Sequence, residues 1–195
     1  QDHAYSRITN PTVQYFEDRV LSVTGAMSVT ALNSGMAAIC NTLMTIGRAK
    51  ANIVTSPHLF GNTWSLMKTT LATFDIEARF CNLTDPDEVR AHIDCNTCAI
   101  FLEVITNPQL EVADLKMLSS IAKEAGVPLI ADTTIVPFSV FHGKDFGIDI
   151  EIVSSTKYIS GGATSIGGLI LDNGTFDWSH FITLKPVSYT HLTLP

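Results

Sequence analysis

The sequence contains no run of basic residues and no long uninterrupted apolar segment. Only 16% of its 195 residues are charged, and 19 acidic residues outnumber 12 basic ones, which gives a formal net charge of -7. This balance makes nucleic acid and anionic membrane surfaces poor partners. No apolar stretch is long enough to span a bilayer. We therefore expect neither a nucleic-acid nor a membrane partner.

Cysteine is also scarce, with four residues in the whole chain. Cys95 and Cys98 form a lone CxxC spacing, whereas a zinc ribbon needs a second pair. A redox CxxC opens a helix after a strand, but this one precedes a predicted strand. We interpret the cysteines as structural free thiols and expect no metal site. Reduced thiols favour a cytoplasmic protein. Internal repeats and low-complexity linkers are absent as well.

Hydrophobic residues make up 46% of the chain, which is enough to bury one sizeable core. Hydrophobic periodicity and turn residues predict alternating strands and helices. The predicted strands cover residues 28–32, 51–56, 76–80, 99–104, 127–131 and 148–153. The predicted helices cover residues 11–22, 35–46, 60–71, 86–93 and 115–125. This alternation predicts an α/β fold with a parallel or mostly parallel sheet flanked by helices.

A polar motif, Ser154-Ser155-Thr156-Lys157-Tyr158, directly follows the last predicted strand. Ligands of open α/β sheets bind at the carboxyl ends of strands. The hydroxyl groups of this motif can hold phosphate oxygens, and Lys157 can form a Schiff base with an aldehyde. Taken alone, the motif also fits a surface lysine in a polar turn.

Other predicted strands also end in groups suited to a ligand. Gly35 opens a helix after a strand, so its N–H groups can cradle a phosphate, although an ordinary capped turn has the same pattern. Phe60 can lie on a planar ligand or belong to the core. Asn107 follows the fourth strand. Asp132 ends a buried strand and needs a salt bridge or a protonated heterocyclic nitrogen. These strand ends should cluster at one edge of the sheet.

Together the motifs resemble the pyridoxal-phosphate enzymes of cysteine and methionine metabolism, the cystathionine γ-synthase/γ-lyase group of fold type I. The resemblance covers about residues 3–185 and rests on Tyr5-Ser6-Arg7, Asn10-Pro11-Thr12, Ser34-Gly35-Met36-Ala37-Ala38, Thr106-Asn107-Pro108, Asp132 and the lysine motif. Within the group, residues 162–168 and Phe176-Asp177-Trp178 most resemble the O-acetylhomoserine sulfhydrylases. The implied fold is the large domain of a fold type I transferase, a three-layer α/β/α arrangement.

The resemblance implies a role for each residue around the cofactor ring. Lys157 is the catalytic residue and forms the Schiff base with pyridoxal 5'-phosphate. Asp132 pairs with the pyridinium nitrogen, and Asn107 lies near the ring hydroxyl. Phe60 stands where the family usually has tyrosine, so stacking on the ring is retained and a phenol acid is lost.

The resemblance also implies how the cofactor phosphate is held. The implied phosphate ligands within one subunit are Ser154, Thr156 and the backbone amides of Gly35 and Met36. Tyr5 and Arg7 reach the phosphate of a neighbouring subunit, so active sites would be shared within a homodimer or homotetramer. Two further departures from the family, Thr133 for asparagine and Ala163 for histidine, bear on reaction specificity.

The implied activity is γ-replacement on a small amino-acid substrate, O-acetyl-L-homoserine, with sulfide or a thiol, giving homocysteine or methionine. Within the family, a cystathionine γ-synthase or a methionine or cystathionine γ-lyase is the alternative. A third hypothesis is a non-catalytic cofactor-binding or assembly fragment.

Family members are much longer than this chain, and their C-terminal domain supplies the arginine that binds the substrate carboxylate. We therefore expect an N-terminal arm and first helix over residues 1–25 and an incomplete cofactor-binding large domain over residues 26–185. Residues 186–195 resemble a translated cloning adaptor, which indicates a non-native tail. On this interpretation the C-terminal small domain is missing and the chain alone is inactive.

Overall fold

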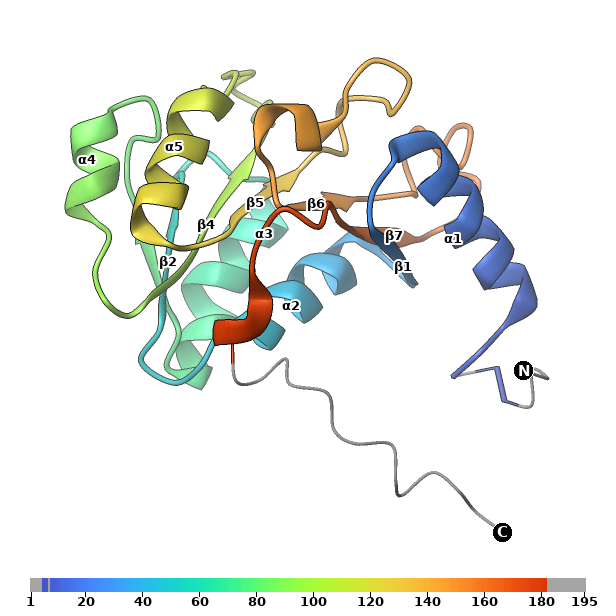
Figure 1. Ribbon diagram of the computed structural model, residues 1–195, viewed down its shortest axis with the longest axis horizontal. Helices are drawn as coiled ribbons and strands as arrows, with labels where there is room; N and C mark the ends of the chain where they lie inside the picture. Colours follow the sequence, from blue (N-terminus) through green and yellow to red (C-terminus); the bar gives the residue numbers. More distant parts are fainter. Residues whose placement is uncertain (1–4, 7, 182–195) are drawn as a thin grey trace, which may run out of the picture.

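The computed structural model describes residues 5, 6 and 8–181. Figure 1 shows one sheet with helices packed against it and with α1 at the opposite end from α4. The strands of the sheet are β1 (Ser28–Leu32), β2 (Asn52–Thr55), β3 (Glu77–Phe80), β4 (Thr97–Glu103), β5 (Leu129–Asp132), β6 (Ile150–Val153) and β7 (Gly168–Asp172). Their spatial order is β1-β7-β6-β5-β4-β2-β3.

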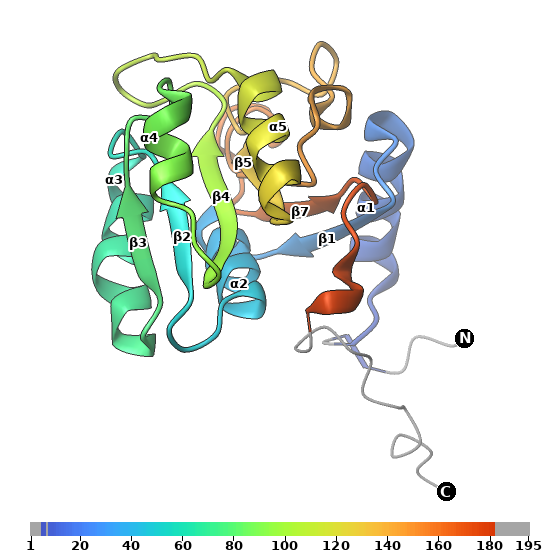
Figure 2. The same cartoon turned by 60° about the vertical axis from the view of Figure 1, so that its left-hand side comes forward.

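The sheet is mostly parallel, as the alternation of strands and helices predicts. Strands β2 to β6 pair in parallel, and β7 pairs antiparallel with both β1 and β6. Figure 2 shows β3, β2 and β4 side by side at one end of this sheet. The sequence analysis predicts strands only as far as residue 153, so β7 is an addition. It connects the first strand of the chain to the last parallel strand.

Five α-helices surround the sheet in the described part of the chain. These are α1 (Pro11–Thr24), α2 (Gly35–Ile46), α3 (Gly61–Ser65), α4 (Pro86–Ala91) and α5 (Leu115–Ala125). Short polar side chains cap four of them, all except α3. The Asn10 carboxamide oxygen accepts hydrogen bonds from the backbone N–H groups of Thr12 and Val13, at 3.0 and 3.2 Å. Gly25 ends α1 in the left-handed conformation, with a φ of 66°.

The prediction of one continuous helix over residues 60–71 is wrong, because three helix types follow one another in this segment. The chain changes from α3 to a π-helix (η1, Leu66–Thr70) and then to a 3-10 helix (η2, Leu71–Phe74). Met67 and Leu71 stay fully buried through this change. Two more 3-10 helices, η3 (Gly143–Phe146) and η4 (Trp178–His180), lie before and after the last two strands.

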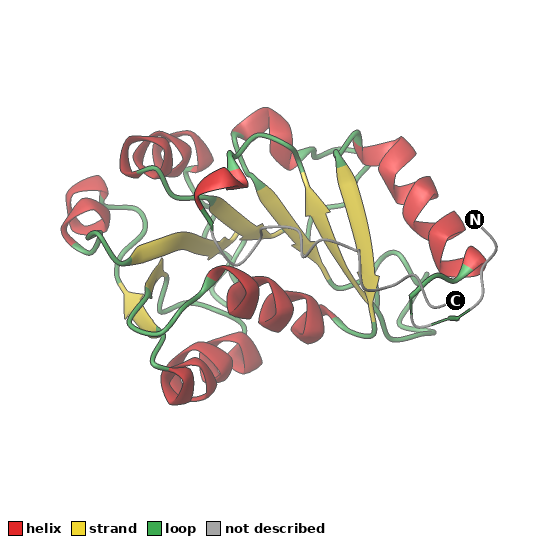
Figure 3. Ribbon diagram, turned by 60° about the horizontal axis from the view of Figure 1, so that its bottom comes forward, coloured by secondary structure: helices red, strands yellow, loops and turns green. Residues whose placement is uncertain are grey.

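Consecutive residues of the central strands belong to different cores, because successive side chains point to opposite faces of a sheet. Ile53 and Phe101 pack in the core that includes α2, whereas Val54 and Leu102 pack in the core that includes α5. Figure 3 shows helices on both faces, which confirms the three-layer α/β/α arrangement. None of the described helices is long and apolar enough to cross a membrane.

Candidate active site

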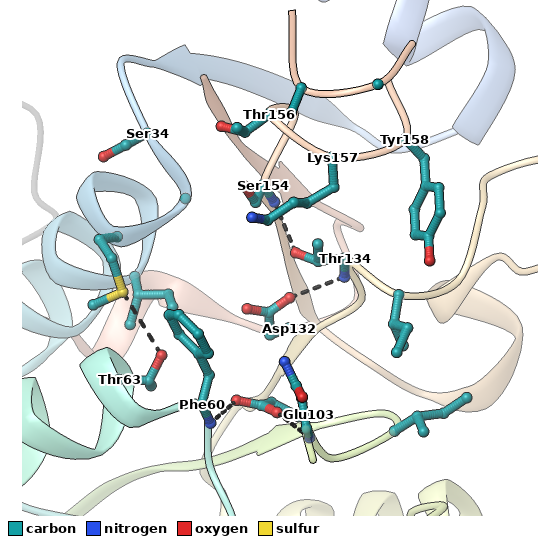
Figure 4. Close-up of a pocket in the computed structure, with 18 of the residues that line it drawn as sticks. Ser34, Phe60, Thr63, Glu103, Asp132, Thr134, Ser154, Thr156, Lys157 and Tyr158 are labelled. Atoms are coloured by element: carbon teal, nitrogen blue, oxygen red, sulfur yellow. Dashed lines mark hydrogen bonds between the residues drawn. The ribbon is translucent and has the colours of Figure 1, made fainter. Parts of the chain in front are cut away.

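A cavity of about 690 Å³ lies at the carboxyl edge of the sheet. Residues that follow β1, β2, β4, β5 and β6 line it, so one cavity gathers the ends of five strands (Figure 4). The lining residues include Gly35, Met36, Phe60, Glu103, Asn107, Asp132, Ser154, Thr156, Lys157 and Tyr158. The structure thus brings together every predicted site residue that follows a strand.

The start of α2 and the end of β6 form an anion-binding corner of this cavity. The hydroxyl of Ser34 caps α2 by accepting from the Ala37 N–H at 3.0 Å. The N–H groups of Gly35 and Met36 belong to the first turn, where a helix offers them no acceptor. A Cβ atom on Gly35 would lie only 2.8 Å from the Cβ of Ser154. The Ser154 side chain therefore borders the positive end of α2, an arrangement suited to phosphate.

The three hydroxyl groups of the lysine motif have different environments. Ser154 and Thr156 line the cavity, whereas Ser155 is buried and does not. The Thr156 hydroxyl accepts from the Gly167 N–H at 3.0 Å and lies 3.2 Å from the Gly167 carbonyl oxygen, to which it donates. Thr156 therefore fixes the loop before β7 as well as bordering the cavity.

Lys157 and Tyr158 are exposed to the cavity from the loop after β6. Figure 4 shows the Lys157 side chain extending toward the space above Asp132. The Lys157 N–H donates to the Ser154 carbonyl oxygen at 3.2 Å, which ties the lysine to the strand end. Lys157 is the one amine side chain among the lining residues, so it is the group that can bond covalently to an aldehyde.

Asp132 ends β5 with its carboxylate facing the cavity. One carboxylate oxygen accepts from the Thr134 N–H at 2.9 Å. Burial raises the pKa of Asp132, and hydrogen bonds from Thr134 oppose this effect. None of the ion pairs among the described residues supplies Asp132 with a cation. A carboxylate in this position is a natural partner for a cationic ligand atom.

Glu103, at the end of β4, is a site residue that the sequence analysis does not identify. Its side chain lines the cavity although the residue is only 7% exposed. The carboxylate accepts from the Phe60 N–H at 2.6 Å and from the Asn107 N–H at 3.2 Å. Burial raises its pKa to about 7, and the charge of Asp132 adds to this shift. A glutamate at the end of a wholly buried strand is the sequence signal for such a residue.

Of the two N-terminal residues of the predicted site, the structure describes Tyr5 alone. Tyr5 is 55% exposed and is not a lining residue. Arg7 lies outside the described residues. Within the described residues, the candidate site therefore consists of residues that follow strands.

The sequence model of the Cys/Met metabolism PLP-dependent enzymes matches residues 1–188. The chain belongs to this family. The expectation from the resemblance is therefore confirmed, and the family cofactor is pyridoxal phosphate. The site fits this cofactor: the corner between α2 and Ser154 suits the phosphate, Asp132 suits a protonated ring nitrogen, and Lys157 suits the aldehyde carbon.

Several relatives are named for sulfhydrylase activity. The O-acetyl-L-homoserine sulfhydrylase of Corynebacterium glutamicum is 38% identical over 94% of this chain and 42% of its own length. The homocysteine synthase of Schizosaccharomyces pombe is 40% identical over 90% of this chain and 41% of its own length. The chain thus spans about two fifths of the length of these curated relatives.

The chain is also similar to solved structures of enzymes with related names. The O-acetylhomoserine sulfhydrylase of Wolinella succinogenes superposes with a TM-score of 0.84 at 47% identity, over 90% of this chain and 50% of that one. A second structure, a putative O-acetylhomoserine (thiol)-lyase from Campylobacter jejuni, has a TM-score of 0.84 at 34% identity, over 87% of this chain and 42% of that one. It contains a pyridoxyl-lysine phosphate residue.

Proposed function

We propose that the whole protein replaces the acetoxy group of O-acetyl-L-homoserine with sulfide or a thiol, giving homocysteine or methionine. The observation that carries this proposal is that Lys157, Asp132 and the start of α2 face one cavity. The names of the relatives support the choice of substrate. When bound, pyridoxal phosphate supplies an electron sink for charge that develops on the substrate carbons.

In this proposal, one group of cavity residues binds the phosphate of the cofactor and another group contacts its ring. Ser154, Thr156 and the N–H groups of Gly35 and Met36 hold the phosphate. The remaining four residues act at the ring and are Phe60, Asn107, Asp132 and Lys157. Phe60 stacks on one face, Asn107 lies near the ring hydroxyl, and Asp132 keeps the ring nitrogen protonated.

Lys157 is the residue that moves protons during the reaction. Loss of a γ-acetoxy group requires removal of a proton from the α carbon and another from the β carbon. The amine of Lys157, when free, would be a base within the same cavity that could accept a proton from either carbon. Phe60 has no acidic group, so the phenol that the family usually has here is not available to assist.

The organisation of the whole protein is also part of this proposal. We propose that residues 1–25 are the arm and first helix, residues 26–185 the incomplete large domain, and residues 186–195 a non-native tail. A C-terminal small domain would supply the arginine for the substrate carboxylate. Tyr5 and Arg7 would reach the phosphate of an adjacent subunit, so a dimer or tetramer shares its active sites. A cytoplasmic location stays a prediction.

The test is to incubate the whole protein, loaded with pyridoxal phosphate, with O-acetyl-L-homoserine and sulfide and to measure homocysteine. We expect rapid formation of homocysteine and little breakdown of methionine or cystathionine. Predominant breakdown would favour the γ-lyase alternative, and cystathionine formed from added cysteine would favour a cystathionine γ-synthase. If the whole protein binds the cofactor but turns over none of these substrates, a role in binding or assembly replaces the proposed activity.

A further inference from the structure

Glu103 occupies the point of the sheet where the strand order reverses. Strand β4 lies between β2 and β5, so its end is flanked by the loop that carries Phe60 and by the end of β5. Glu103 is paired in register with Asp132 across β4 and β5. Ligands of open α/β sheets bind at such switch points. Glu103 therefore stands next to the ring end of the proposed cofactor site.

Both carboxylate oxygens of Glu103 are engaged with backbone groups. One oxygen accepts from the Phe60 N–H at 2.6 Å, and the other accepts from the Asn107 N–H at 3.2 Å. Phe60 lies 43 residues before Glu103, and Asn107 lies four residues after it. A single buried side chain thus joins the loop after β2 to the loop after β4. Figure 4 shows the bonds converging on Glu103.

We propose that Glu103 is a positioning residue that sets the distance between the Phe60 ring and the Asn107 side chain at the two sides of the cofactor ring. This inference rests on the proposed binding of pyridoxal phosphate in the cavity. Glu103 acts through Phe60 and Asn107, because its two carboxylate oxygens accept from their backbone N–H groups. When Glu103 is ionised, its bonds to the two backbone N–H groups are charge-assisted and therefore stronger than neutral ones.

The decisive variant is Glu103→Gln in the whole protein. An amide replaces one of the two acceptor oxygens with an NH2 group, so it can no longer accept from Phe60 on one atom and from Asn107 on the other. We expect the dissociation constant of pyridoxal phosphate, measured by equilibrium dialysis, to rise by roughly 10-fold or more. The circular dichroism of the bound cofactor should also change at saturation. Glu124→Gln is the matched control, because Glu124 pairs with Arg90 and does not line this cavity.

A double-mutant cycle separates positioning from a merely structural role. The Phe60→Ala variant keeps the backbone N–H but lacks the ring, so in that background Glu103→Gln should cost clearly less cofactor affinity. Equal losses in both backgrounds would show that Glu103 does not act through the ring. The Glu103→Asp variant keeps the charge but is one methylene shorter. Weaker binding of pyridoxal phosphate by Glu103→Asp would support the positioning role of Glu103, and unchanged binding would overturn it.

These experiments distinguish an error in the role of Glu103 from an error in the proposed function. Unchanged affinity and unchanged dichroism in Glu103→Gln, together with a lower melting temperature, would show that Glu103 only stabilises the fold. Should the unaltered protein fail to bind pyridoxal phosphate, the proposed function itself would be wrong. Should Glu103→Gln fail to fold, Glu103→Asp provides the same comparison of affinity and dichroism.

Discussion

Gly35 and Ser154 approach so closely that a Cβ atom on Gly35 would lie 2.8 Å from the Cβ of Ser154 and 3.1 Å from its Cα. One residue opens α2 and the other follows β6, although the two are far apart in sequence. A side chain on Gly35 would therefore push the start of the helix away from the strand end. The proposed phosphate corner depends on this contact.

The Gly35→Ala variant tests the corner. Forcing a methyl group into this contact should destabilise the protein by about 1–3 kcal/mol. The displaced N–H groups should also weaken binding of pyridoxal phosphate by about 10-fold, because charge-assisted bonds to the phosphate are lost. Gly61→Ala is the control, since Gly61 opens α3 and a Cβ there would meet nothing within 4 Å. Equal cofactor affinity in the two variants would contradict the proposed corner.

The Asp132→Asn variant tests the partner of the ring nitrogen. A neutral amide no longer holds a proton on that nitrogen, so turnover should fall by at least about 100-fold. The cofactor should still attach to Lys157, because Lys157 bonds to the aldehyde carbon of the cofactor and not to the ring nitrogen. Asp145→Asn, in the exposed part of η3, should leave turnover unchanged. Normal turnover of Asp132→Asn at full cofactor occupancy would mean that Asp132 is a structural carboxylate.

The raised pKa of Glu103 predicts a pH dependence of stability in the cofactor-free protein. Its folded-state pKa is about 7 against an ordinary value of 4.5, so its protonated form favours folding. This contribution is present below pH 4.5 and is lost as pH rises through about 7. Relative to Glu103→Gln, the unaltered protein should lose roughly 3 kcal/mol between these limits.

Urea unfolding of both proteins at several pH values measures this difference directly. The other aspartate, glutamate, lysine and histidine residues that line the two cavities bordered by Glu103 are unchanged in the comparison: Asp132, Lys157, His58, Glu88 and Glu111. A difference in the free energy of unfolding that is constant from pH 5 to pH 8 would show that the Glu103 pKa is not raised.

If active sites are shared between subunits, mixing two inactive variants of the whole protein should restore activity. Arg7→Ala removes the arm's contact with phosphate, and Lys157→Ala removes the attachment to the cofactor. In a mixed dimer, one site receives Lys157 from the first chain and an intact arm from the second. Mixing equal amounts should restore up to about a quarter of the activity, because half of the dimers are mixed and each has one complete site. If subunits exchange and no activity returns, each arm serves its own chain.

Local sequence signals predict much of this fold because they act over a few residues. Asn10, Ser34 and Asp114 cap helices where short polar side chains precede an apolar stripe, and Gly25 and Gly126 end helices in the left-handed conformation. The spacing of apolar residues places six of the strands. The strand β7 is not predicted, because the glycine-rich stretch before it is typical of turns and its pairing with β1 is a long-range event.

Placement of the strand ends also follows from sequence, since parallel strands bring their carboxyl ends to one edge. That reasoning finds Gly35, Phe60, Asn107, Asp132 and Lys157. It does not find the contacts of Glu103, because they depend on backbone groups of a loop 43 residues away. Nor does it show that the Thr156 hydroxyl bonds the backbone of Gly167, which becomes evident only when β7 is in place.

Attachment of the cofactor to Lys157 is the central claim, and its most direct test is chemical. The whole protein is incubated with pyridoxal phosphate, reduced with borohydride and digested, and the mass of each lysine peptide is measured. The account predicts that the reduced cofactor is found on the peptide that contains Lys157. It predicts no fixed cofactor in Lys157→Ala and normal labelling in Lys144→Ala, whose side chain is exposed outside the cavity. Stoichiometric label on another lysine, or none on Lys157, would contradict it.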